Sequence, residues 1–342
     1  MNDLFSPFTI KGLDLKNRIV MPPMCQYSVD KKDGVATEWH YMHYVSRAIG
    51  GTGLVIVEMT DVEPDGRISD FDLGLWSDDQ IPALKRIVDA CHSYGAKVGI
   101  QIAHAGRKAE DAEVPVAPSA IAFDEKSKQP RALTTEEVKG QVEKFRAAVA
   151  RAVQAGFDTI ELHGAHGYLI HQFHSPLTNK RDDEYGKDLT LFGRQVIQAA
   201  KAEMPEDMPL LMRISAIEYV EGGYGIQESI AFAKEYQDAG VDVFHISAGG
   251  EGPIAAWGRP GTHAAYQVPL AKQIKESLDI PVIAVGRLDD PILANAVIGN
   301  EEADLVAVGR GMLRNPYWAL ETASKLKKRN ANSKTVYDRF LN

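Results

Sequence analysis

Residues 282–287 have the sequence VIAVGR, and residues 305–310 repeat it as LVAVGR. In both copies a run of apolar residues, rich in β-branched side chains, ends in a glycine followed by an arginine. Strands that are apolar throughout, rather than alternating, are typical of parallel sheets covered on both faces. The two copies therefore predict adjacent parallel strands of an α/β fold, each ending in a Gly-Arg step.

The same pattern recurs in the rest of the chain. Six earlier runs show it, so that with 282–285 and 305–308 eight strands are expected; the six are 19–24, 54–59, 98–103, 159–163, 210–215 and 243–247. Helical patterns separate these runs. Eight strand–helix units without a break in composition favour one (β/α)8 TIM barrel over residues 1–342. A doubly wound open sheet is the alternative, although no G-x-G-x-x-G follows the first strand.

Helix boundaries support this division of the chain. Gly95, Gly156 and Gly240 stand where a helix is expected to end, and glycine readily adopts the left-handed cap conformation. A long helix is expected at residues 136–155. It is preceded by Thr134 and carries a carboxylate at Glu137, the capping-box arrangement.

Two segments fall outside the repeat. Residues 8–10 and 13–15 flank Lys11-Gly12 and predict a β-hairpin that plugs the bottom of the barrel. Residues 104–133, after the third strand, form a connection longer than compact domains usually contain, which indicates a lid or binding loop. A tolerated surface insertion is an equal alternative.

Composition excludes several classes of protein. The chain has 342 residues, 44% of them hydrophobic, and a net charge of -9, which disfavours nucleic acid and anionic lipid as partners. Its two cysteines, Cys25 and Cys91, are too few for a disulfide framework or a thiolate metal site, and Cys91 is expected to be a packing residue. No apolar run is long enough to span a membrane. We therefore expect a soluble, cytoplasmic protein without a metal.

Ligands of a barrel sit at the carboxyl ends of its strands. The polar residues expected there are Cys25, Glu58, Gln101, His104, His163, His166, Arg213, Ser247, Arg287 and Arg310. Glycine lets backbone N–H groups approach a phosphate, and arginine can hold its oxygens. The paired Gly286-Arg287 and Gly309-Arg310, with Gly249 and Gly250, therefore predict a phosphate site. Alternatively, these glycines only turn the strand–helix loops.

The sequence HGAHGY at residues 163–168 follows the fourth strand. His163 and His166 could ligate a metal or donate hydrogen bonds to one substrate oxygen. Further metal ligands are not evident at the other strand ends, so stabilisation of an oxyanion is favoured. Tyr168 keeps its proton at neutral pH and can serve as a general acid.

Together these motifs resemble the old yellow enzyme family of flavin-dependent ene-reductases, within it the thermophilic-like, cysteine-containing bacterial branch. The resemblance covers nearly the whole chain. It rests on LKNRIVM at 15–21, Pro23-Met24-Cys25 with Tyr27, GIQIAHAGRK at 99–108, HGAHGYLI at 163–170, DEYG at 183–186, and Gly309-Arg310.

The resemblance implies a TIM barrel that binds FMN without a covalent bond and is reduced by NADPH or NADH. It places Pro22, Pro23, Met24 and Cys25 along the isoalloxazine ring, and Gln101 and Arg213 on its pyrimidine side, where a positive group stabilises the anionic reduced flavin. It assigns the FMN phosphate to the six residues Gly249, Gly250, Gly286, Arg287, Gly309 and Arg310. Met59 stands beside the flavin where relatives have a smaller residue.

For the reaction, the resemblance implies reduction of the activated C=C bond of an α,β-unsaturated carbonyl or nitro compound. His163 and His166 hold the substrate oxygen, flavin N5 delivers hydride to Cβ, Tyr168 protonates Cα, and Tyr27 contacts the ligand. In this branch an arginine of the C-terminal tail reaches a neighbouring subunit. Arg339, in the tail at 330–342, is the matching residue, which implies a homodimer or homotetramer. Residues 186–194 depart from the family pattern and leave the local helix start open.

Three other functions remain as alternatives. A flavin-dependent RNA-uridine reductase would use a similar barrel, but the net charge of -9 counts against it. A metal-dependent barrel hydrolase would need ligands beyond the two histidines. A catalytically silent flavin-binding barrel would have no need for His163, His166 and Tyr168 together.

Overall fold

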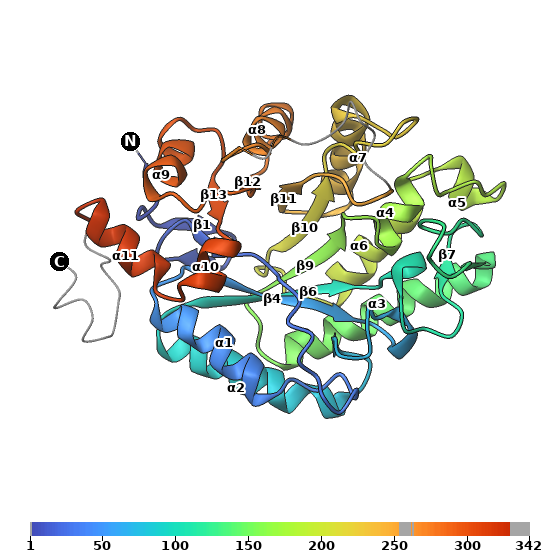
Figure 1. Ribbon diagram of the computed structural model, residues 1–342, viewed down its shortest axis with the longest axis horizontal. Coiled ribbons are helices and arrows are strands. Elements are labelled where there is room, and N and C mark those ends of the chain that lie inside the picture. The colour runs from blue at the N-terminus through green and yellow to red at the C-terminus, as the bar shows by residue number, and fades with distance from the viewer. Residues whose placement is uncertain (1, 253–260, 262, 329–342) are drawn as a thin grey trace.

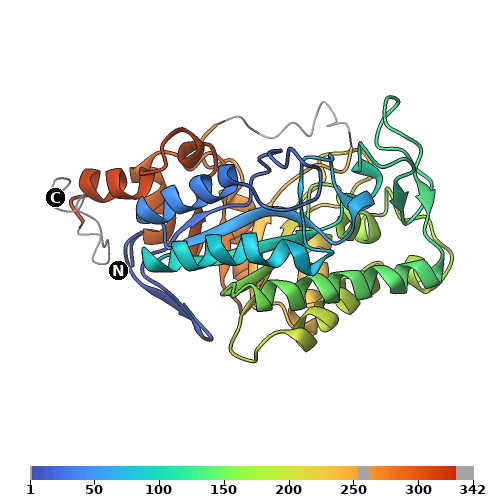
Figure 2. The ribbon, with the colours of Figure 1, turned by 90° about the horizontal axis from the view of Figure 1, so that it is seen from below.

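The computed structural model describes residues 2–252, 261 and 263–328. Arg339 and the rest of the expected trans-acting tail lie outside the described residues. The described chain is built around one barrel, which Figures 1 and 2 show from two directions.

Eight parallel strands close the barrel, as predicted. They are β3 (Ile19–Met21), β4 (Leu54–Asp61), β6 (Lys97–Ala103), β9 (Thr159–Gly164), β10 (Leu210–Ser215), β11 (Val243–Ser247), β12 (Val282–Ala284) and β13 (Leu305–Ala307). Closure comes from β3, which pairs with β13 on one side and with β4 on the other. The open-sheet alternative is therefore excluded. The short strand β5 (Leu73–Gly74) pairs with the end of β4 outside this ring.

Helices surround the ring of strands (Figure 1). They are α1 (Glu38–Ile49), α2 (Ile81–Ser93), α3 (Thr135–Gln154), α4 (Leu169–His174), α5 (Glu184–Lys187), α6 (Leu191–Glu203), α7 (Ile226–Ala239), α8 (Val268–Ser277), α9 (Pro291–Gly299), α10 (Arg310–Arg314) and α11 (Trp318–Lys325). The predicted capping box is present, since Thr134 Oγ1 accepts from the Glu137 N–H and Glu137 Oε2 accepts from the Thr134 N–H. Gly95, Gly156 and Gly240 all have the positive φ that ends a helix. The departure from the family pattern at 186–194 resolves as the break between α5 and α6.

The N-terminal hairpin plugs the barrel as expected. Its strands β1 (Phe8–Ile10) and β2 (Leu13–Leu15) pair antiparallel. Leu13 and Leu15 are buried in a cluster with inward-facing residues of the strands, among them Leu54, Leu211 and Val243. Burying two leucines there contributes about 3–6 kcal/mol of hydrophobic free energy. The hairpin thus closes the amino-terminal end of the barrel and leaves the carboxyl end for ligands.

The long connection after β6 is ordered and folds onto itself. Its first turn is a 3-10 helix (Gly106–Lys108), and β7 (Val116–Ala117) pairs parallel with β8 (Arg131–Ala132). Arg107 holds the middle of the connection by donating to the carbonyls of Ile121 and Ala122. In the described part of the chain, no helix is long and apolar enough to cross a membrane.

Candidate active site

Three aromatic side chains, one from the end of β9 and two from the residues after it, converge at the carboxyl end of the barrel. The ring centroids of His163 and Tyr168 are 4.8 Å apart, and those of His163 and His166 are 5.2 Å apart. His163 is buried, whereas His166 and Tyr168 are partly exposed. The predicted cluster therefore exists as one group of side chains.

His163 is a neutral hydrogen-bond donor. Its Nδ1 accepts the backbone N–H of Ala165 at 3.3 Å, so that the neutral ring carries its proton on Nε2. Burial, followed by the charge of Arg213, lowers the pKa of His163 well below its usual range. At neutral pH this side chain therefore presents a neutral N–H to the site.

His166 is held in an unusual backbone conformation. Its φ is 60°, in the left-handed region, and its N–H donates to Ser215 Oγ at 3.1 Å. Its Nε2 lies 2.7 Å from Ser247 Oγ, which leaves Nδ1 as the ring nitrogen without a described protein partner. Strained conformations of non-glycine residues cluster at functional sites. Burial and Arg213 lower the pKa of His166 as well.

Tyr168 is a protonated phenol. Burial raises its pKa well above the usual range, and nearby Cys25 and Tyr27 raise it further. The ammonium of Lys108 lies 5.0 Å from the centroid of the Tyr168 ring. Lys108 also donates to the carbonyls of His166 at 2.9 Å and Gly250 at 3.2 Å. It therefore connects residues 165–168, after β9, to the long connection after β6.

A bulge in β4 shapes the opposite wall. The pairing between β4 and β6 shifts register between Val57 and Thr60, which turns Glu58 and Met59 out of the regular alternation. Glu58 Oε1 then accepts the Gln26 N–H at 2.9 Å and fixes the loop that carries Cys25. Burial, followed by the charge of Glu58, raises the pKa of the Cys25 thiol, so this cysteine is not a thiolate.

The floor of the site is a layer of buried polar groups inside the barrel. Gln101 Nε2 donates to Glu161 Oε1 at 2.7 Å, and Glu161 Oε2 lies 2.8 Å from His245 Nδ1. Gln101 was predicted from the sequence, whereas Glu161 and His245 were not. A carboxylate and an imidazole inside the otherwise apolar strands TIELH and VFHIS were the available signal.

Arg213 is a buried arginine of β10 whose guanidinium has no hydrogen-bond acceptor among the described residues. Its side chain is 8% exposed, and it makes no hydrogen bond to any residue that the structure describes. A buried guanidinium requires an acceptor. The anionic pyrimidine ring of a reduced flavin offers such acceptors, so the residues at this strand end fit the cofactor.

The predicted phosphate residues lie around the same end of the barrel. Gly309 lies beside Met24 and Pro22, where an added Cβ would make only ordinary van der Waals contacts. An added Cβ at Gly286 would lie 2.8 Å from Oε1 of Gln267, whose Nε2 donates to Ser247 Oγ. Gly250 contacts the backbone of His166. Arg287 and Arg310 are exposed.

The remaining predicted residues divide between wall and rim. Met59 is 2% exposed and packs in a small cluster that includes Cys25 and Tyr168. Pro22 and Pro23 are buried, and Tyr27 is 51% exposed with a φ of 51°. Cys91 is buried inside α2 and is a packing residue, as expected.

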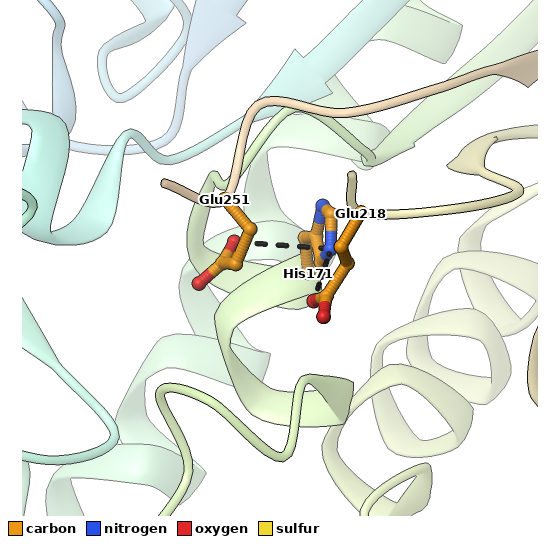
Figure 3. Close-up of side chains that lie close together, drawn as sticks. All are labelled: His171, Glu218 and Glu251. Carbon is orange, nitrogen blue, oxygen red and sulfur yellow. Dashed lines mark hydrogen bonds and ion pairs between the residues drawn. The ribbon is translucent and has the colours of Figure 1, made fainter. Parts of the chain in front are cut away.

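A second buried cluster consists of His171, Glu218 and Glu251 (Figure 3). His171 Nδ1 accepts the Gly167 N–H at 3.0 Å, so the neutral ring has its proton on Nε2, 3.1 Å from Glu218 Oε1. Glu251 Oε1 pairs with Arg107 at 3.2 Å, and Glu251 Oε2 lies 3.8 Å from His171 Nε2.

These three residues have the composition of a metal site, but their hydrogen bonds give them another role. A ring nitrogen that donates its proton to Glu218 has no lone pair to offer a metal. The cluster instead supports the backbone of Gly167, which lies between His166 and Tyr168.

Comparisons with known proteins identify the family of this chain. The profile of the NADH:flavin oxidoreductase / NADH oxidase family matches residues 3–329. The chain therefore belongs to this family, which is the old yellow enzyme family, and it is an NAD(P)H-dependent flavin oxidoreductase that uses FMN.

Its similar relatives include an NADPH dehydrogenase of Listeria monocytogenes, 50% identical over 333 residues, with 95% of this chain and 96% of that protein covered. An NADPH dehydrogenase of Clostridium acetobutylicum is 46% identical, with 99% of both chains covered.

Solved structures show the same architecture. Morphinone reductase is 27% identical, with a TM-score of 0.79 over 95% of this chain and 90% of that chain. A 2-naphthoyl-CoA reductase superposes with a TM-score of 0.88 at 26% identity over 95% of this chain. The present chain covers 52% of that longer protein.

Proposed function

We propose that this protein is an ene-reductase, which reduces the activated C=C bond of α,β-unsaturated carbonyl or nitro compounds with NADPH or NADH. The observation that carries the proposal is the contact between His163, a neutral N–H donor, and Tyr168, a protonated phenol, with ring centroids 4.8 Å apart. The reaction requires two groups, a hydrogen-bond donor to the substrate oxygen and an acid that protonates Cα.

In this proposal the histidines polarise the substrate. His163 donates from Nε2 and His166 from Nδ1 to the carbonyl or nitro oxygen, which draws electron density from Cβ. Neutral donors suit this task, because they stabilise developing negative charge without giving up a proton. Tyr168 then transfers its phenolic proton to Cα. FMN, bound without a covalent bond, supplies the hydride for Cβ from N5.

We assign the parts of FMN to residues at the carboxyl ends of the strands. We assign the flavin ring to the wall formed by Pro22, Pro23, Met24, Cys25 and Met59, with Gln101 and Arg213 on the pyrimidine side. The phosphate would be held by Gly249, Gly250, Gly286, Arg287, Gly309 and Arg310. The buried Nε of Arg213 has no hydrogen-bond partner among the described residues, which supports this orientation, since the guanidinium presents a positive charge where a reduced flavin is anionic.

Tyr27 and Arg339 complete the proposed substrate site, Tyr27 from the exposed rim and Arg339 from a neighbouring subunit of a homodimer or homotetramer. Removal of residues 337–342 tests the second assignment. If Arg339 acts in trans, the KM for the enone rises while flavin reduction by NADPH is unchanged. An unchanged KM would contradict the shared site.

The two half-reactions test the whole proposal. Anaerobic addition of NADPH should bleach the flavin absorption, and 2-cyclohexenone should restore it. In the variant His163→Ala/His166→Ala, NADPH should still bleach the flavin while cyclohexenone no longer restores it. Reoxidation at the wild-type rate in this variant would refute the oxygen-binding role. A wild-type enzyme that enones do not reoxidise would be a flavoprotein of another specificity.

A further inference from the structure

A pocket of about 400 Å³ lies within the long connection after β6. Its lining includes four cationic side chains, Arg107, Lys108, Lys126 and Lys128, and the ring of Phe123. Two carboxylates, Glu110 and Asp124, also line it. The lining thus has more cationic than anionic side chains, whereas the whole chain has a net charge of -9.

Three of the cations have no carboxylate partner among the described residues. Lys108 Nζ donates only to the carbonyls of His166 and Gly250. Lys128 Nζ donates to the carbonyls of Glu110 at 2.8 Å and Ala112 at 2.7 Å. Lys126 makes its described hydrogen bond through its backbone N–H, to Asp124 Oδ1. Arg107, by contrast, is paired with Glu251. Carbonyl oxygens orient ammonium groups without neutralising them, so the pocket retains positive charge for an anionic ligand.

This pocket adjoins residues 165–168. The ammonium of Lys108 lies 4.6 Å from the centroid of Phe123 in the pocket and 5.0 Å from the centroid of Tyr168 in the site. A molecule whose reactive end lies beside Tyr168 would reach the pocket by passing Lys108, which contacts a ring on each side. The FMN phosphate is assigned to the glycines and arginines after β11, β12 and β13, so this pocket is a second anion site.

The reductant is a molecule of that shape. A reduced nicotinamide dinucleotide carries an uncharged dihydronicotinamide at one end and a diphosphate, with a further 2′-phosphate in NADPH, toward the other. We propose that the Lys108–Lys126–Lys128 pocket binds the phosphate groups of the nicotinamide dinucleotide during reduction of the flavin. This inference rests on one part of the proposed function, namely that the reaction takes place beside His163 and Tyr168.

The test uses the FMN-loaded enzyme with Lys126→Glu/Lys128→Glu. Lys234→Glu is the matched control, since Lys234 is exposed on α7 and lies outside the lining of the pocket. Anaerobic stopped-flow reduction gives the Kd for NADPH. Each reversed charge replaces an attraction with a repulsion, so we expect the double variant to weaken this Kd about tenfold or more. The control should match the wild type.

Calorimetry with 2′,5′-ADP supplies a readout independent of turnover. Wild type and control should bind this probe competitively with NADPH, and the double variant should bind it at least about tenfold more weakly. Comparison of NADH with NADPH then identifies the phosphate concerned. Equal weakening of both indicates the diphosphate, and selective weakening of NADPH indicates the 2′-phosphate.

An unchanged Kd for both dinucleotides in the double variant would overturn the inference. The proposed function is tested separately, because flavin reduction and flavin reoxidation are measured in different experiments. It would be refuted if cyclohexenone did not reoxidise the flavin of the wild type. The rate of reoxidation by cyclohexenone should be the same in the double variant and in the control.

Discussion

His163 and Tyr168 meet edge to face, with an interplanar angle of 75° between their rings. His163 belongs to the end of β9, whereas Tyr168 directly precedes α4. The strand end and the helix start thus bring a hydrogen-bond donor and an acid to one point. In the proposed mechanism neither side chain holds the flavin, so flavin reduction and flavin reoxidation should respond differently to their replacement.

Replacement of Tyr168 by phenylalanine should remove the acid and keep the ring. We expect flavin reoxidation by 2-cyclohexenone to slow by about 10²–10⁴-fold, the usual contribution of a positioned general acid. Flavin reduction by NADPH should change little. Stopped-flow measurement of each half-reaction checks this, and an equal loss in both would indicate damage to the site rather than loss of a proton donor.

The rate of reoxidation should depend little on pH between pH 6 and 9. In the proposed mechanism Tyr168 acts in its protonated form, and its raised pKa keeps it protonated as the pH rises toward the usual value of about 10. His163 acts in its neutral form, and its lowered pKa keeps it neutral as the pH falls past the usual value of about 6.5. A pH–rate profile of the oxidative half-reaction measures this. A decrease centred near pH 6.5 would contradict the neutral state of His163.

Replacement of Arg213 by methionine should weaken flavin binding. The variant loses charge-assisted hydrogen bonds, each worth about 1.5–3 kcal/mol, so the Kd for FMN should rise by roughly tenfold to a hundredfold. The midpoint potential should fall, since the anionic reduced flavin loses its counter-charge. Arg213→Lys is the matched control and should retain most of the potential. Flavin release and spectroelectrochemistry provide the two measurements, and an unchanged potential in the methionine variant would place Arg213 away from the ring.

The cluster of His171, Glu218 and Glu251 should stabilise the protein without a metal. Replacement of His171 by alanine leaves Glu218 with an unmet acceptor, which costs about 1–3 kcal/mol of unfolding free energy. Denaturant unfolding measures this loss. EDTA should leave the wild-type Tm and activity unchanged, and a stabilising response to added Zn²⁺ would restore the metal interpretation.

Much of the site could be predicted because its elements are local in sequence. HGAHGY places both histidines and the tyrosine within six residues, and Arg213 lies near the carboxyl end of an easily recognised strand. Glu161 and His245 were not predicted, because 84 residues separate them and their contact exists only once the barrel closes. The bulge at Glu58 and Met59 was also missed, since register depends on the partner strand.

The eight strands, the hairpin and the capped helix could be predicted from the sequence, because apolar periodicity, turn glycines and capping residues act over a few positions. The chemistry of the individual groups, by contrast, depends on their surroundings in the closed barrel. The neutral state of His163 depends on burial beside Arg213, and the tilt of His166 depends on Ser215 and Ser247 from two other strands. Lys108 contacts both Phe123 and Tyr168, and its contact with Tyr168, 60 residues away in the chain, also exists only in the folded barrel. Desolvation and long-range contacts are properties of the closed barrel, and no short segment contains them.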